Sequence, residues 1–300
     1  MKKVVFILGP TAVGKTYFSV KLAKELDGEI VSADSVQIYK GLDIGSAKVT
    51  KEEMQGVKHY AIDILEPEED FSVYDFIEYT KKKIDEIIAK GKTPIVVGGT
   101  ALYVKALTLG YNFGGASYDK EQRQKIEKML AENGLEHVYN LLKETSPAMA
   151  ESVDRHNPVR VVRALEIALS GGKKTESKTD IDGLLIALSR DRQKLYDDIN
   201  RRVDIMLENG LVDEVKGLME RGLTLENQCM KAIDYKEVYA FLKGEYDYDR
   251  MVELLKQHSR NYAKRQMTFL RGMQNIHFVN TEDREKAFKE ILKLVEEWKR

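Results

Sequence analysis

A glycine-rich segment near the beginning of the chain has the residue types and the spacing that bind phosphate groups. Residues 9–16 contain two glycines, the second followed directly by a lysine and a threonine. In this pattern backbone N–H groups converge on phosphate oxygens, the lysine reaches the terminal phosphates and the threonine hydroxyl ligates Mg²⁺. We therefore expect a bound di- or triphosphate, with Mg²⁺ as cofactor. The expected phosphate-binding residues are Gly9, Pro10, Thr11, Ala12, Val13, Gly14, Lys15 and Thr16, with Thr16 as the metal ligand.

The residues on either side of this segment predict the elements that position it. Val4–Leu8 form a short apolar run of the kind found in buried strands, and apolar residues recur at helical spacing from Tyr17 to Leu26. The predicted helix begins beside the phosphate, where its N-terminus carries partial positive charge. The alternative is a glycine turn that merely precedes a helix, and the order of strand, loop and helix argues against it.

Further strands and helices alternate along the first ~110 residues, as is typical of a parallel sheet covered on both faces. Asp34 and Thr100 each follow a predicted strand, so we expect both at the carboxyl ends of strands, where ligands of open α/β sheets bind. The predicted strands are Val4–Leu8, Glu29–Ser32, Tyr60–Ile64, Thr93–Val97, Leu184–Leu188 and one near His277–Val279.

A helical pattern interrupts this alternation in the middle of the chain. We predict an α/β fold with a P-loop NTPase-like parallel sheet flanked by helices, formed by residues 1–115 and 183–300. Residues 116–182 form a helical insertion domain within it. Long helices are predicted over 191–221 and 247–274.

Composition sets limits on the kind of protein this is. The formal net charge is −1, so a nucleic-acid surface has to be a local basic patch. The single cysteine, Cys229, excludes a disulfide within the chain. No apolar stretch has the length of a membrane span, and we expect no signal peptide and no membrane partner. The expected location is cytoplasmic, and the expected state is a monomer.

Motifs along most of the chain carry a family resemblance. They lie at residues 9–16, 34–39, 41–48, 71–76, 98–103, 157–166, 201–206, 210–215 and 262–268. In this order they resemble the tRNA dimethylallyltransferases, also called tRNA isopentenyltransferases or the IPP transferase family. The chain departs from the family pattern at Asp234, where a glycine is usual, and at Phe269, where a tryptophan is usual.

The resemblance implies transfer of a dimethylallyl group from dimethylallyl diphosphate to N6 of adenosine 37 in the anticodon loop of tRNA. Lys15 would stabilise charge on the departing diphosphate, and Arg202 would make a second diphosphate contact. Asp34 would take the proton from the amino group, and Thr100 would contact the reacting centre. From the residues alone, Asp34 could instead cap a helix.

Two basic stretches are candidates for the tRNA-binding surface. Arg160 and Arg163 share one face of a helix that begins at Pro158. Residues 256–271 hold five basic residues and no acidic one, although a solvated helix face is the alternative interpretation. Arg265 falls toward the apolar side and is expected to point inward to an anion. The implied tRNA-binding residues are Asp34, Ser35, Val36, Gln37, Arg123, Val159, Arg160, Val161, Val162, Arg163, Arg260, Lys264, Arg265 and Arg271.

Three other functions use the same phosphate-binding segment. A small-molecule kinase is one, but it requires an acidic residue at the end of the strand that here ends in Gly98-Gly99. A prenyltransferase acting on a free adenine nucleotide is another, and the basic helix and the insertion favour a large RNA over it. An RNA-binding module without activity has to explain why Lys15, Thr16, Asp34 and Thr100 are all present.

Overall fold

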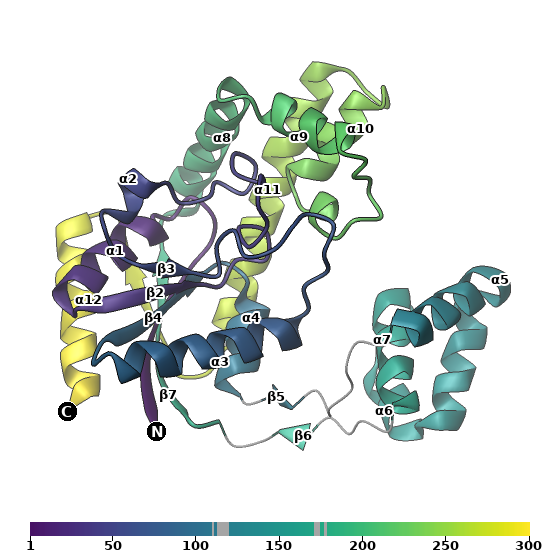
Figure 1. Ribbon diagram of the computed structural model, residues 1–300, viewed down its shortest axis with the longest axis horizontal. Coiled ribbons are helices and arrows are strands. Elements are labelled where there is room, and N and C mark those ends of the chain that lie inside the picture. Colours follow the sequence, from purple (N-terminus) through teal and green to yellow (C-terminus); the bar gives the residue numbers. More distant parts are fainter. Residues whose placement is uncertain (110, 113–119, 171–174, 177–178) are drawn as a thin grey trace. The chain divides into compact units, whose positions relative to one another are not determined.

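The computed structural model describes residues 1–109, 111–112, 120–170, 175–176 and 179–300 (Figure 1). These residues form two compact units. The first contains Met1–Thr108 and Asp180–Arg300, and the second contains Leu109–Thr179. Of the two boundaries expected from the sequence, residue 116 lies outside the described residues and residue 182 lies inside a strand of the first unit.

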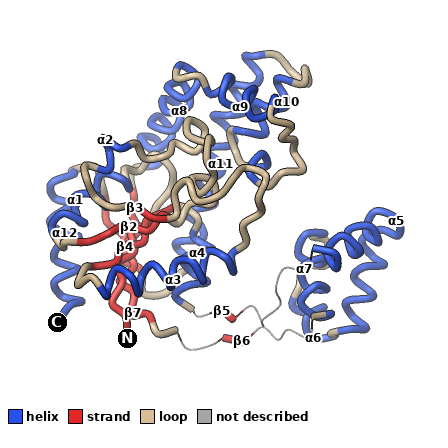
Figure 2. The backbone as a smooth tube through the Cα atoms, viewed as in Figure 1, coloured by secondary structure: helices blue, strands red, loops and turns tan. Residues whose placement is uncertain are grey.

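The first unit is built on a six-stranded sheet whose neighbouring strands are all parallel (Figure 2). The strands in spatial order are β3 His59–Tyr60, β2 Gly28–Ser32, β4 Thr93–Gly98, β1 Lys2–Leu8, β7 Ile181–Ser189 and β8 Ile276–Asn280. The second unit interrupts the chain between β4 and β7, and β7 then pairs directly with β1. The predicted α/β fold with a parallel sheet is confirmed.

Helices cover both faces of the sheet (Figure 1). Val5 and Ile7 of β1 pack in one core cluster with helices α1 (Lys15–Glu25) and α12 (Arg284–Lys299). Helices α3 (Val73–Ala89) and α4 (Ala101–Thr108) cover the other face, and the rings of Phe76 and Tyr103 stack between them at 4.2 Å. This packing fixes the carboxyl ends of the strands relative to the start of α1.

The remaining helices of the first unit gather beyond the carboxyl ends of the strands (Figure 1). They are α2 Lys51–Met54, α8 Arg192–Glu208, α9 Leu211–Glu220, the 3₁₀ turn η1 Cys229–Lys231, α10 Tyr235–Leu242 and α11 Tyr248–Arg271. The single helix predicted over 191–221 is wrong, because Gly210 has a φ of 95° and separates α8 from α9. Glycine adopts this left-handed conformation without strain.

Strand β3 is shorter than the predicted strand over 60–64. It contains only His59 and Tyr60, which pair with Ile30 and Val31 of β2. The next residue, Ala61, has a φ of 59°, a left-handed conformation that ends an extended strand. This correction leaves the order of the sheet unchanged.

The second unit contains helices around a core of its own. Its elements are β5 Tyr111–Asn112, α5 Lys120–Thr145, α6 Pro147–Ser152, α7 Pro158–Leu169 and β6 Thr175–Glu176. Val138, Leu142, Val161 and Leu165 are all buried in its core cluster. Within the described part of the chain, every helix is too short or too polar to cross a lipid bilayer.

Candidate active site

The glycine-rich segment forms the predicted turn between β1 and α1. Helix α1 begins at Lys15, and Gly14 before it has a φ of 92°. Gly9 is also constrained, because a β-carbon there would lie 3.0 Å from the carbonyl oxygen of Leu188. The backbone N–H groups at the start of α1 have no partner within the helix, so this end of the helix can bind an anion.

Lys15 folds back over this turn. Its Nζ donates to the carbonyl oxygens of Gly9, at 3.1 Å, and Pro10, at 2.7 Å. The pKa of Lys15 is lowered to about 8, chiefly by burial and then by the nearby positive charge of Arg202, against the opposite influence of Asp34. A bound anion would favour the charged ammonium, so this lysine is prepared to pair with phosphate.

Asp34 lies immediately beyond β2 and lines the same cavity as Lys15. Its Oδ1 accepts hydrogen bonds from the backbone N–H groups of Val36, at 2.9 Å, and Gln37, at 3.2 Å. The alternative interpretation of Asp34 as a helix cap is wrong, because the residues that follow it form turns and the next helix begins at Lys51. The two hydrogen bonds hold the carboxylate at the cavity wall.

Two residues of α11 connect the phosphate-binding turn to the end of β4. Gln266 accepts from the backbone N–H of Thr11 at 3.1 Å and donates to the carbonyl oxygen of Gly99 at 2.9 Å. Burial raises the pKa of Tyr262 to about 12, and the charge of Asp34 adds to this, whereas hydrogen bonding to Thr100 opposes it. Tyr262 and Asp34 both line the cavity, whereas Thr100 is not among the described residues on its lining.

Arg202 reaches this site from α8 and is half-buried. Burial lowers its pKa, while the carboxylates of Asp234 and then Asp34 favour its charged form. Lys15 and Arg202 thus bring two positive charges to one cavity. Like charges held in this way favour an anionic ligand with more than one negative charge.

These residues enclose a cavity of about 820 Å³, formed entirely by the first unit. This volume lies within the range of small-molecule and cofactor sites. Gly9, Pro10 and Val13 are buried behind the cavity wall. Predicted residues on the lining are Thr11, Ala12, Gly14, Lys15, Thr16, Asp34, Ser35, Val36, Gln37, Arg202 and Arg265.

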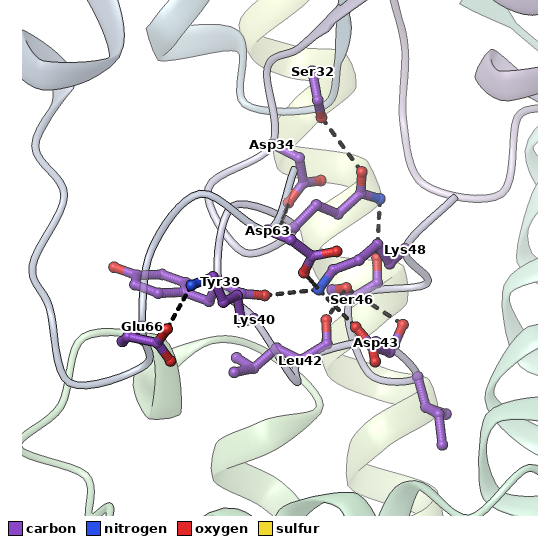
Figure 3. Close-up of polar contacts among 12 residues, drawn as sticks. Ser32, Asp34, Tyr39, Lys40, Leu42, Asp43, Ser46, Lys48, Asp63 and Glu66 are labelled. Carbon is purple, nitrogen blue, oxygen red and sulfur yellow. Dashed lines mark hydrogen bonds and ion pairs between the residues drawn. The ribbon is translucent and has the colours of Figure 1, made fainter. Parts of the chain in front are cut away.

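One wall of the cavity is the loop 43–48, which ion pairs and hydrogen bonds hold in place. The buried side chain of Lys48, at the end of this loop, forms ion pairs with Asp43, at 2.6 Å, and Asp63, at 2.5 Å, as Figure 3 shows. Glu214 of α9 accepts the backbone N–H groups of Asp43, Ile44 and Gly45, at 2.7–3.1 Å. These three hydrogen bonds connect α9 to the loop.

Sequence reasoning missed several residues of this site. Gln266, Ser259 and Asp234 are buried polar residues that line the cavity. Their signal in the sequence is weak: Gln266 and Ser259 lie on the buried stripe of α11, where polar residues need partners. Those partners come from distant segments, so the sequence alone does not identify them.

The residues of α11 predicted to bind tRNA differ in their surroundings. Lys264 and Arg271 are exposed. Arg260 is half-buried and donates to Asn200 at 2.5 Å, and Lys256 forms an ion pair with Asp204 at 2.6 Å. Helix α8 thus supplies the acid that the stretch 256–271 itself lacks.

The expected inward orientation of Arg265 is wrong. Arg265 is exposed, lines the cavity and lies over the ring of Tyr262 at 5.7 Å. The reason is that the cavity opens beside this part of α11, so a residue next to the buried stripe faces open space. Arg265 therefore lies at the cavity wall without being buried.

In the second unit the predicted basic residues share a buried carboxylate. Arg163 pairs with Glu166 at 2.9 Å, and Arg123 lies 3.3 Å from the other oxygen of the same carboxylate. The side chains of Val161 and Val162 are buried in the core cluster, and a tRNA contact at these two residues stays a prediction. They face inward because α7 packs its apolar side on α5. Arg160 and Val159 are exposed.

The cavity has the donor set for a magnesium ion held together with a ligand's phosphates. The described residues contain no group of three or more His, Cys, Asp or Glu side chains able to hold a metal ion. Thr16 offers a hydroxyl oxygen on the cavity lining next to Lys15. Mg²⁺ commonly takes few protein ligands and completes its shell with water and substrate phosphates, so the residues fit this ion.

Comparison with known proteins extends these observations. The IPP transferase family profile matches residues 37–273. A tRNA dimethylallyltransferase of Bacillus anthracis is 46% identical over 302 residues, covering 98% of this chain and 96% of that protein.

Solved structures give the same result. The tRNA isopentenylpyrophosphate transferase of Bacillus halodurans aligns with a TM-score of 0.76 and 41% identity, covering 100% of this chain and 98% of that one. A eukaryotic dimethylallyltransferase described as acting on tRNA aligns with a TM-score of 0.80 and 26% identity, covering 99% of this chain and 80% of that one. The chain belongs to the tRNA dimethylallyltransferase family.

Proposed function

We propose that this chain transfers a dimethylallyl group from dimethylallyl diphosphate to N6 of adenosine 37 in tRNA and releases diphosphate. The observation that carries the proposal is that one cavity brings together the phosphate-binding turn, Arg202 and the carboxylate of Asp34. The relatives named tRNA dimethylallyltransferase support the same reaction. We also propose that the chain works as a monomer, because the cavity is formed by a single chain.

The positive groups of the cavity act on the leaving diphosphate. As the carbon–oxygen bond breaks, negative charge grows on the departing oxygen, and donors already in position stabilise this charge more than the ground state. Lys15 and Arg202 supply two such charges, and the N-terminus of α1 supplies backbone N–H groups. Mg²⁺ held by Thr16 would neutralise further charge on the diphosphate.

Asp34 acts on the acceptor. The adenine amino group is a weak nucleophile because its lone pair is delocalised into the ring. As the carbon–nitrogen bond forms and the carbon–oxygen bond breaks, the amino group loses a proton to Asp34, and the diphosphate leaves with the bonding electrons. The N–H groups of Val36 and Gln37 hold the carboxylate in one orientation, which favours this transfer.

Basic residues outside the cavity bind the tRNA backbone in this proposal. Lys264 and Arg271 are exposed on α11, and Arg160 is exposed on α7 of the second unit. A base in a single-stranded loop is extruded at small cost, so contacts to the surrounding phosphates can supply most of the affinity. Arg265 at the cavity wall would meet a phosphate close to the extruded adenosine.

The decisive experiment incubates the protein with unmodified tRNA that carries adenosines at 36–38, dimethylallyl diphosphate and Mg²⁺. Mass spectrometry of the digested tRNA is expected to find a five-carbon addition at adenosine 37. Lys15→Ala serves as the inactive control, because it removes a charge from the diphosphate site. Transfer to free AMP with tRNA ignored, or phosphate transfer from ATP to a small acceptor, would replace the proposal with one of the alternative functions.

A further inference from the structure

Gln266 is a buried amide that hydrogen-bonds two backbone segments far from it in sequence. It lies on the buried stripe of α11 and is only 6% exposed. Its Oε1 accepts the backbone N–H of Thr11 in the phosphate-binding turn at 3.1 Å, and its Nε2 donates to the carbonyl oxygen of Gly99 after β4 at 2.9 Å. One side chain thus ties the turn to the end of β4, through an acceptor on one side and a donor on the other.

The phosphate-binding turn has a backbone conformation that needs support from outside the turn. Ala12, the residue after Thr11, has a φ of 63°, a left-handed conformation that is unfavourable for a residue with a β-carbon. Strain of this kind persists where the surrounding structure imposes it. Lys15 supports the turn through two of its carbonyl oxygens, but it would leave them to pair with a phosphate. The hydrogen bond from Thr11 to Gln266 would then still hold the turn.

The other hydrogen bond of this amide leads toward the carboxylate of Asp34. Thr100, the residue after Gly99, donates its backbone N–H to the carbonyl oxygen of Ala33 at 3.2 Å, and Ala33 directly precedes Asp34. A β-carbon at Gly99 would collide with the Gln266 amide, so this close approach requires glycine. A connected series of hydrogen bonds therefore runs from the phosphate-binding turn to the strand end that carries Asp34.

We propose that Gln266 is a positioning residue, which fixes the donor's diphosphate relative to the carboxylate of Asp34. The inference rests on the proposed function, because it takes the ligand of the turn to be the donor and the group at Asp34 to be the adenine amino group. A displacement in which one bond forms while another breaks requires the attacking nitrogen, the carbon and the leaving oxygen in line. A small shift of one site relative to the other therefore slows the step. Gln266 acts through the two segments and bonds to no reacting atom.

Two variants break this link in different ways. Gln266→Met keeps the length of the side chain and removes both hydrogen bonds. Gly99→Ala adds a methyl group that displaces the flexible end of the glutamine, so it breaks the link with little disturbance of the fold. Leu270→Val is the matched control, since Leu270 lies one turn further along the same buried stripe and is 2% exposed. It changes the packing of α11 and removes no side-chain hydrogen bond.

The test measures the rate of prenyl transfer in a single turnover, with enzyme in excess over tRNA and with saturating dimethylallyl diphosphate and Mg²⁺. Calorimetric titration gives the Kd for inorganic pyrophosphate, and urea unfolding establishes that each variant is folded under the assay conditions. We expect the rate to fall by about 10–100-fold in Gln266→Met and in Gly99→Ala, while the Kd changes by less than about threefold. Leu270→Val should stay within about twofold of the wild type in both, because a protein that loses one methylene of packing remains almost entirely native.

The difference between the effect on rate and the effect on affinity separates positioning from a structural role. Lower stability alone changes neither quantity in a protein that stays folded. Wild-type rates in both Gln266→Met and Gly99→Ala would overturn the inference. A rate loss that Leu270→Val shares, or that is matched by an equal loss of pyrophosphate affinity, would overturn it as well. A wild type that binds pyrophosphate but transfers no dimethylallyl group to tRNA would instead overturn the proposed function.

Discussion

In the proposed reaction Asp34 takes up a proton with the same carboxylate that accepts two backbone N–H groups, and its variants separate these two roles. Asp34→Asn keeps an oxygen that can accept the N–H groups of Val36 and Gln37, but it cannot take a proton. We expect its single-turnover rate of prenyl transfer to fall by about 10²–10⁴-fold, the range for loss of a general base. Its affinity for pyrophosphate should stay within twofold of the wild type, measured by calorimetric titration.

Asp34→Ala also loses the oxygen that accepts the N–H groups of Val36 and Gln37. It should lose about 1 kcal/mol of stability in addition to its activity, measured by urea unfolding. The comparison of the two variants assigns the rate effect to the proton transfer and the stability effect to the lost hydrogen bonds. A near-normal rate in Asp34→Asn would remove Asp34 as the base.

The pKa of Lys15 predicts how kcat/KM for dimethylallyl diphosphate depends on pH. Its folded-state pKa of about 8 lies below the usual lysine value, chiefly because of burial. Because the protonated ammonium is the form that pairs with diphosphate, kcat/KM for the donor should fall above pH 8, by about tenfold at pH 9. Steady-state kinetics of the wild type from pH 7 to pH 9.5 measure this decrease. A profile that is level to pH 9.5 would mean that the essential form of Lys15 is not the ammonium.

The sequence predicts some residues of the site better than others for a physical reason. The phosphate-binding turn is contiguous, so its whole chemistry is visible in eight successive residues. Gln266 contributes because α11 brings it between Thr11 and Gly99, a contact that no local pattern records. The orientation of Arg265 could not be predicted, because helical periodicity indicates the apolar side of α11 but not where the cavity opens beside that helix.

At the scale of elements, the loop 43–48 depends on a helix that is far away in the sequence. Glu214 of α9 accepts three backbone N–H groups of the loop and also the hydroxyl of Tyr235, at 2.7 Å. Glu214→Gln keeps the size of the side chain but turns an amide N–H₂ group toward these donors. We expect a loss of about 1–3 kcal/mol of stability, measured by urea unfolding, because a charged acceptor is removed from several donors.

The same substitution should weaken donor binding through the cavity wall, as a rise in KM for dimethylallyl diphosphate larger than the change in kcat. Asp213→Asn is the control, since Asp213 is the preceding residue of α9 and is exposed. Its stability should remain within about 0.5 kcal/mol of the wild type. Equal effects of the two variants would show that stability and donor binding depend on the charge of α9 and not on the hydrogen bonds from the loop 43–48 to Glu214.

Helix α11 offers a test of the tRNA surface, because it carries both exposed basic residues and a basic residue that forms an ion pair. Lys264 and Arg271 are exposed, whereas Lys256 on the same helix forms an ion pair with Asp204. A phosphate contact releases counterions, so Lys264→Ala together with Arg271→Ala should reduce the slope of log affinity against log salt by about 1.4–1.8. Lys256→Ala should change the slope less. Filter binding of tRNA across a salt series measures both, and equal slopes in the double variant and the wild type would exclude these two contacts.

At the scale of the whole molecule, the order of elements was predictable where short apolar strands alternate with helices. The break between α8 and α9 was not, because apolar spacing continues across it and only the conformation of Gly210 reveals it. The sequence predicted that a strand, β7, follows the second unit, but it did not predict that this strand pairs with β1. The partner strand and the register depend on contacts between segments far apart in sequence.

The division into two units predicts separable unfolding. Every residue that lines the cavity belongs to the first unit, and the second unit has its own core. Differential scanning calorimetry of the full chain should resolve two transitions, and pyrophosphate with Mg²⁺ should raise only that of the first unit, because a ligand stabilises the part that binds it. Leu165 is fully buried in the second unit. Leu165→Ala should therefore lower only the other transition, by about 2–5 kcal/mol of unfolding free energy. A single transition that both changes shift together would instead mean that the two units fold as one cooperative body.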